Sequence, residues 1–160
     1  MINNTLKYAL LKYSPVILLF TSILNEIDFN NSDYTYFSFN FVYILIFYYS
    51  LKRDGGIGYI FIFIAGLFND VMNGQPMGIS SLCYLLLSAA AVYLRNITLR
   101  PNMLKDWVFF LITILVLNFI NFMTLVIFLD YEMNYFDQMI NISFTFLLYI
   151  FFSFIFKTYD

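Results

Sequence analysis

Six long apolar stretches, separated by short connections that carry most of the charged residues, constrain this chain more than any other feature. They cover residues 8–27, 34–51, 55–72, 76–94, 107–129 and 138–156. A helix needs roughly 20 apolar residues to cross a bilayer, so each stretch predicts one transmembrane helix. Only 11% of the residues are charged, against about 25% in a typical soluble domain. We therefore expect an all-α integral membrane protein with a single polytopic domain, residues 1–160.

All eight basic residues fall on one side of these predicted helices. They are Lys7, Lys12, Lys52, Arg53, Arg95, Arg100, Lys105 and Lys157, whereas the connections on the other side hold Glu26, Asp28, Asp33, Asp130, Glu132 and Asp137. Connections rich in lysine and arginine remain in the cytoplasm. The chain is therefore predicted to have six transmembrane helices with both termini cytoplasmic, the first of them an uncleaved span.

The basic connection from Arg95 to Asp106 is predicted to be a solvated cytoplasmic loop. Pro101 prevents a continuous helix through it, because proline lacks the N–H that a helix interior needs. An alternative role for this connection is a docking surface for a filament or for anionic lipid headgroups.

One polar stretch, GLFNDVMNGQPMG at residues 66–78, interrupts the apolar pattern and forms the predicted outer turn between the third and fourth spans. Gly66 and Asp70 lie four residues apart and share a helical face, which we expect to pack against other helices. Asp70 has two interpretations. It is a binding or coupling carboxylate, as ionisable groups inside membranes commonly are, or a turn residue whose oxygens accept free backbone N–H groups at a helix end.

The glycines and the proline of the same stretch have predicted backbone roles. Gly74 suits a left-handed helix stop, and Pro76 suits the first turn of the next helix, where its missing N–H is not needed. Gly78 begins a stripe of small residues that admits a close neighbouring helix; its other members are Ser81 and Ser88.

Elsewhere, the strongest polar feature is a pair of asparagines in the fifth span. Asn118 and Asn121 are three residues apart and share a helical face. We interpret them as interhelical hydrogen-bonding residues, worth about 1 kcal/mol each, with the lining of a substrate path as the alternative.

Catalytic chemistry has little support in the sequence. The chain has no histidine, the commonest general base and metal ligand, and its one cysteine, Cys83, lies in an apolar run that favours packing. An intramembrane aspartyl protease needs two facing carboxylates, and the spans offer Asp70 without a partner. We expect a non-enzymatic protein with no catalytic residues, no metal and no cofactor.

The polar stretch resembles the signature of the rod shape-determining protein MreD family. That signature has a glycine, an aspartate four residues later and a Gly-x-Pro-Leu/Met-Gly turn, positions held here by Gly66, Asp70, Gly74, Pro76 and Gly78. The following Ile-Ser-Ser-Leu-Cys-Tyr-Leu-Leu continues the similarity, while the methionine at 77 stands where leucine is commoner. The specific similarity covers about 20 residues, and the chain length and the basic connection after the fourth span also fit.

The resemblance implies a multi-pass component of the cell-elongation machinery in the bacterial inner membrane, an adaptor for peptidoglycan synthesis and rod-shape maintenance. The implied partners are MreC, the MreB filament, RodA and the class B penicillin-binding transpeptidase, besides the lipid bilayer, with no nucleic acid. The implied fold is similar to the six-helix substrate-binding subunits of energy-coupling vitamin transporters. The alternative function is such a subunit of a small-molecule transporter, in which Asp70, Asn73, Gln75 and the asparagines of the fifth span would converge on a cavity.

Overall fold

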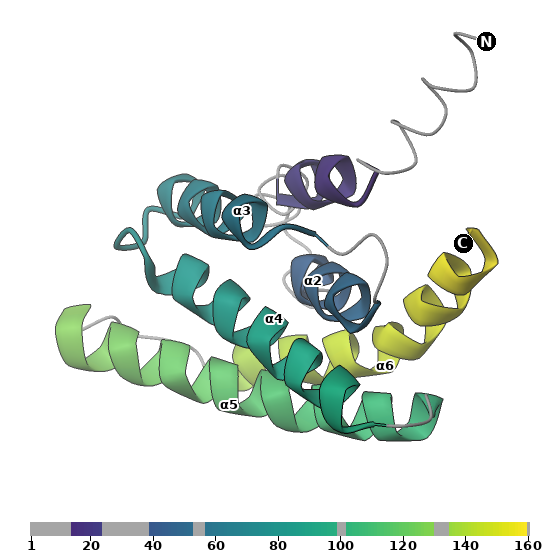
Figure 1. The fold of residues 1–160 in the computed structure, drawn as a ribbon. Coiled ribbons are helices and arrows are strands. Elements are labelled where there is room, and N and C mark those ends of the chain that lie inside the picture. The colour runs from purple at the N-terminus through teal and green to yellow at the C-terminus, as the bar shows by residue number, and fades with distance from the viewer. Residues whose placement is uncertain (1–13, 24–38, 53–56, 99–101, 130–134, 160) are drawn as a thin grey trace, which may run out of the picture.

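The computed structural model of the protein describes residues 14–23, 39–52, 57–98, 102–129 and 135–159. These residues form six helices and no strand (Figure 1): Ser14–Ile23, α2 (Phe41–Leu51), α3 (Tyr59–Met72), α4 (Ile79–Ile97), α5 (Met103–Leu129) and α6 (Tyr135–Tyr159). The expected all-α fold is confirmed over this part of the chain.

Helix α4 lies at the centre of the arrangement. It packs against α2, α3 and α5, while α6 packs against α2 and α5. In Figure 1, α3 and α5 lie on opposite sides of α4. The helix Ser14–Ile23 contacts α3 through an edge-on pair of rings, Phe20 and Phe68, whose centroids are 5.9 Å apart. Because α4 contacts three neighbours, its small and polar side chains decide how closely these helices approach.

Helix α2 is the most enclosed of the described helices. Its residues 42–47 are all buried. A helix that is apolar around its whole circumference must be covered by other helices or by lipid. The ring of Phe47 contacts Phe110 of α5 and Tyr149 of α6, with centroids 4.9 and 5.7 Å apart. These aromatic contacts place α2 in the core of the bundle.

Three helices, α4, α5 and α6, are long and apolar enough to cross a membrane. Helix α5 has 27 residues and is therefore about 40 Å long, which exceeds the roughly 30 Å hydrocarbon core of a bilayer. Large apolar side chains such as Phe119, Phe151 and Phe154 are exposed on α5 and α6, as expected of surfaces that face lipid. These features indicate a membrane protein.

The other three described helices are shorter than the predicted spans. Helix α2 begins at Phe41, because the side chain of Asn40 accepts the N–H of Tyr43 and caps the helix there; residues 34–38 of the predicted span lie outside the described residues. Helix α3 begins at Tyr59 and ends at Met72 as predicted, and residues 55–56 of its predicted span likewise lie outside. The helix at 14–23 lies within the predicted 8–27, whose two ends lie outside the described residues. Six complete spans with cytoplasmic termini therefore remain a prediction.

The connection between α4 and α5 is shorter than the predicted loop. Helix α4 continues to Ile97 instead of ending at 94, and α5 begins at Met103 instead of at 107. Arg95 and Asp106 consequently lie in the last turn of α4 and the first turn of α5, not in a solvated loop. Pro101 lies outside the described residues.

Candidate functional site

Asp70 is fully buried at the end of α3, where its carboxylate binds the first turn of α4. Its Oδ2 accepts the N–H of Gly78 at 2.6 Å, and its Oδ1 accepts the N–H of Ser80 at 2.9 Å. Gly78 is the N-cap residue of α4 and has no side chain that could accept these bonds. Asp70 therefore caps α4 from the preceding helix and places a negative charge at the positive end of the α4 dipole. This geometry matches the turn interpretation of Asp70.

The end of α3 is closed by backbone hydrogen bonds around Gly74. The N–H of Gly74 donates to the carbonyl of Val71 at 3.4 Å, and the N–H of Gln75 donates to the carbonyl of Asp70 at 2.9 Å. This pair of bonds is the Schellman arrangement, which requires a left-handed residue at the position of Gly74. Gly74 has a φ of +63°, so the predicted left-handed helix stop is confirmed.

Two predictions for the second half of the turn are wrong. Pro76 precedes α4 and does not lie in its first turn; its carbonyl accepts the N–H of Ile79, the first helical residue, at 3.5 Å. The reason is Gly78, whose φ of +108° takes the backbone off the helical path between them. A Cβ at Gly78 would meet nothing within 4 Å. Gly78 is thus needed for its backbone conformation and not for close helix approach.

The close approach of α3 and α4 occurs at Gly66 instead. A Cβ added to Gly66 would lie 2.3 Å from the Cα of Ser81, closer than atoms can pack. The hydroxyl of Ser81 donates to the carbonyl of Phe63 at 3.1 Å, and Nδ2 of Asn69 donates to Oγ of Ser80 at 3.0 Å. The shared face of Gly66 and Asp70 therefore packs against α4, as predicted.

Ser88 of the predicted small-residue stripe contacts α2. Its Oγ lies 2.9 Å from the Oγ of Ser50, and both residues are buried. Further along α4, Nη1 of Arg95 donates to the carbonyls of Ser50 at 3.2 Å and Lys52 at 2.7 Å. These carbonyls belong to the C-terminal end of α2, where helical partners are missing. Helix α4 is thus capped by α3 at one end and caps α2 at the other.

Among the described residues, the asparagines of α5 show no side-chain hydrogen bond to another helix. Nδ2 of Asn118 donates to the carbonyl of Ile114 in its own helix at 2.8 Å. The interhelical bond at this point runs from Nε2 of Gln138 in α6 to the backbone carbonyl of Asn118 at 3.4 Å. The buried Oδ1 of Asn121 has no hydrogen-bond partner among the described residues. The Asp70 oxygens are directed at the α4 backbone and not at these asparagines.

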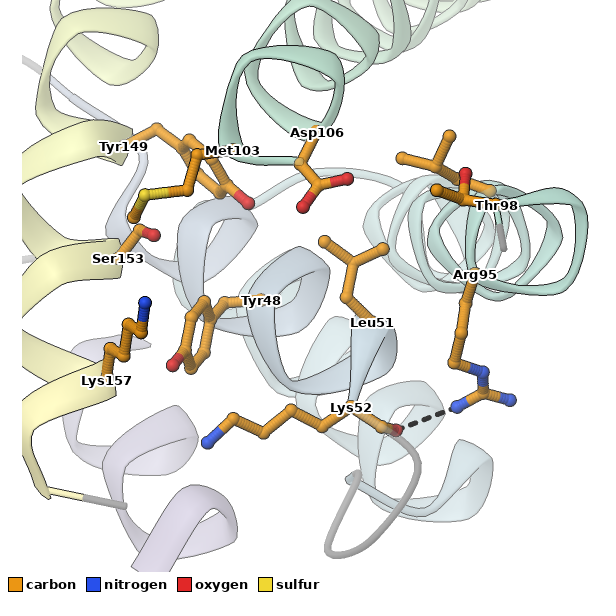
Figure 2. Close-up of a pocket in the computed structure, with 11 residues that line it drawn as sticks. Tyr48, Leu51, Lys52, Arg95, Thr98, Met103, Asp106, Tyr149, Ser153 and Lys157 are labelled. Carbon is orange, nitrogen blue, oxygen red and sulfur yellow. Dashed lines mark hydrogen bonds between the residues drawn. The ribbon is translucent and has the colours of Figure 1, made fainter. Parts of the chain in front are cut away.

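A second polar group gathers at the opposite end of α4, around a cavity of about 380 Å³ between α2, α4, α5 and α6 (Figure 2). Its lining consists of Tyr48, Leu51, Lys52, Leu94, Arg95, Thr98, Met103, Asp106, Tyr149, Ser153 and Lys157. Among these lining residues, Lys52, Arg95 and Lys157 are positively charged and Asp106 is the one negatively charged side chain. We call this cavity the basic pocket.

Lys52 of the basic pocket lies near an aromatic ring. Nζ of Lys52 is 4.8 Å from the centroid of the Tyr48 ring, within cation–π distance. Burial lowers the pKa of the Lys52 ammonium below its ordinary value. In the view of Figure 2, the side chains of Lys52, Tyr48 and Lys157 are drawn below those of Asp106 and Tyr149. Both lysines line the pocket, Lys52 partly buried and Lys157 exposed.

Sequence reasoning placed Lys52, Arg95 and Lys157 on the same side of the membrane but did not bring them together as a site. They belong to different helices, and Tyr48 and Asp106, which join them in the pocket, had no predicted role. The available signal was the position of each cation at the end of an apolar stretch on the basic side.

The described residues define an all-helical protein with three helices long and apolar enough to cross a membrane, and with α3 and α4 joined by a turn built on a buried carboxylate. Comparisons with known protein families, with curated proteins and with solved structures find no match to this chain.

Proposed function

We propose that the protein is a non-enzymatic, multi-pass adaptor of the bacterial cell-elongation machinery, similar to the MreD family, which supports peptidoglycan synthesis and rod shape from the inner membrane. The observation that carries the proposal is the double hydrogen bond of Asp70 to Gly78 and Ser80. Both oxygens of the most conspicuous carboxylate are used to hold two helices together. A carboxylate engaged in this way maintains a surface and is not available to a substrate.

The turn held by Asp70 presents apolar side chains. Val71 is 55%, Met72 44% and Met77 74% exposed. Exposed apolar residues on a backbone fixed by hydrogen bonds suit contact with another membrane protein, because little conformational entropy is lost when the contact forms. This surface, which we call the turn surface, is the proposed contact site for MreC.

The wider proposal follows the sequence resemblance. It comprises six spans with cytoplasmic termini, a fold similar to the substrate-binding subunits of energy-coupling vitamin transporters, and partnership with the MreB filament, RodA and the class B penicillin-binding transpeptidase. The segregation of all eight basic residues to one side supports the orientation. In this orientation the turn surface lies on the outer side.

The test is complementation in a rod-shaped bacterium depleted of the protein. Depletion should give rounded cells, and the unmodified chain should restore rods and co-purify with MreC. Met77→Gln makes the turn surface polar without touching the hydrogen bonds of Asp70, and it should accumulate normally but fail in both assays. Leu104→Gln, which alters an exposed apolar residue in the first turn of α5, is the matched control and should behave like the unmodified chain.

Two outcomes would contradict this proposal. Rod shape retained after complete depletion, together with loss of uptake of a small nutrient, would replace the adaptor by the transporter subunit. Retention of MreC by the Met77→Gln variant would remove the turn surface as the contact site.

A further inference from the structure

We propose that the basic pocket binds the phosphate headgroup of an anionic phospholipid, with Lys52 and Lys157 as the phosphate ligands. The inference depends on the membrane location that three long apolar helices indicate and on the proposed orientation, which puts the basic residues on the cytoplasmic side, and not on the role in cell shape. It assigns a ligand to the end of the molecule opposite the turn surface.

The charge of the basic pocket matches a phosphodiester. Its lining side chains carry three positive charges and one negative charge. Helices α2, α4 and α6 end beside it and α5 begins there. At about half a charge for each helix end, these dipoles together add roughly one negative charge. Over the described lining residues and helix ends, the net charge is therefore about one positive charge.

The three cations have different roles. Arg95 binds the carbonyls of Ser50 and Lys52 through Nη1, so it is a positioning residue that fixes the backbone from which the Lys52 side chain extends. Lys52 lies over the Tyr48 ring, and Lys157 lines the same pocket from α6. A lysine ammonium is a compact charge with three donors, well suited to phosphate oxygens that approach from one side.

The size and lining of the pocket favour a lipid over a free phosphate ion. A cavity of about 380 Å³ lies within the roughly 300–1,000 Å³ typical of small-molecule sites and exceeds the needs of inorganic phosphate. Leu51, Leu94 and Met103 line it as well, and these side chains suit the glycerol and the first acyl carbons. Basic pockets between transmembrane helices on the cytoplasmic side are a recognised setting for anionic headgroups.

The binding test uses the purified full-length chain in a non-ionic detergent, titrated with dioleoylphosphatidylglycerol or dioleoylphosphatidylcholine and observed by native mass spectrometry. The anionic lipid should be retained in preference to the zwitterionic one. Lys52→Gln combined with Lys157→Gln should weaken phosphatidylglycerol binding by roughly 30-fold, since each lysine near an anionic headgroup contributes about a factor of five. Lys105→Gln removes an exposed charge from the same end of the molecule but outside the pocket, and should change binding by less than roughly threefold, because solvent and salt screen an exposed charge.

A gain-of-binding variant separates the site from a folding defect. Asp106→Asn removes the negative charge from the pocket and should strengthen phosphatidylglycerol binding by about fivefold. Loss of binding in that variant, equal retention of both lipids, or unchanged binding in the double lysine variant would overturn the proposal. Displacement of the lipid by millimolar glycerol phosphate or inorganic phosphate would assign the pocket to a soluble phosphate compound and overturn the lipid assignment. None of these outcomes depends on cell shape.

Discussion

The carboxylate of Asp70 and the backbone N–H of Ser80 form a 2.9 Å hydrogen bond that fastens the end of α3 to the first turn of α4. The second oxygen of the same carboxylate accepts the N–H of Gly78 at 2.6 Å. The two donors occupy two different oxygens, and the side chain is fully buried. Each oxygen of Asp70 therefore accepts a backbone hydrogen bond that the other oxygen does not accept.

Asp70→Asn should destabilise the protein, and Asp70→Leu should destabilise it further. Asparagine caps an isolated helix about as well as aspartate, but here its NH₂ group would face one of the two N–H donors. The expected cost is about 1–3 kcal/mol for one buried donor left without an acceptor, and more for leucine, which leaves two. The measurement is thermal unfolding in detergent followed by a thiol-reactive dye, because the chain has a single cysteine and Cys83 is buried.

The control for this series is Asn73→Ala, an exposed substitution beside the same turn. It should unfold at the temperature of the unmodified protein. Equal stability of the aspartate, asparagine and leucine forms would show that the carboxylate does not hold the turn.

Gly66→Ala should separate α3 from α4. The added Cβ would lie 2.3 Å from the Cα and 2.5 Å from the N of Ser81, both backbone atoms that cannot rotate away. Overpacking of this kind costs about 1–3 kcal/mol. Gly58→Ala is the matched control, since its Cβ would meet only the Phe61 side chain at an ordinary 3.4 Å. The same dye assay compares the two, and equal unfolding temperatures would refute the close crossing at Gly66.

Ser50 and Ser88 should show coupled effects on stability. Their hydroxyls lie 2.9 Å apart in the core between α2 and α4. Ser50→Ala and Ser88→Ala each remove the bond. The loss of stability in the double variant should therefore be about 0.6 kcal/mol smaller than the sum of the two single losses, the average coupling for such pairs in membranes. A double-mutant cycle on thermal unfolding measures this coupling. Strict additivity would show that the hydroxyls do not interact.

The predicted orientation can be checked with fusions to a reporter that is active only outside the cytoplasm. Fusions after Ser32 and Tyr135 should be active, and fusions after Asp54, Asn102 and Asp160 should be silent, because lysine and arginine flank the last three positions. Activity at Asn102 would contradict the six-span topology.

Patterns among neighbouring residues in the sequence predicted some of these structural features correctly and others not. The all-α class follows from the apolar stretches, and the left-handed stop at Gly74 follows from a glycine placed after a helix. The four-residue spacing of Gly66 and Asp70 gave the face that packs on α4. The position of Pro76 was wrong because it depends on Gly78, whose left-handed backbone is held by a carboxylate from another helix.

Contacts between helices that are far apart in the sequence could not be predicted, for a related reason. Ser88 meets Ser50, 38 residues away, and nothing in the spacing of small residues on one helix identifies the helix that covers them. The basic pocket forms where the ends of four helices lie together, an arrangement set by tertiary packing. The early start predicted for α2 has a different cause: the apolar run continues on both sides of Asn40, so composition conceals the cap that the structure uses.

The position of α4 in the chain has a consequence for biosynthesis. Asp70 is translated before Gly78 and Ser80, and the carbonyls of Ser50 and Lys52 are translated before Arg95. While the chain is still growing, α3 carries a carboxylate without its N–H donors and α2 carries carbonyls without their guanidinium donor. The deficit of α3 ends once Gly78 and Ser80 have been added, and that of α2 ends only when Arg95 follows, so both earlier helices depend on the synthesis of α4 for their last hydrogen bonds.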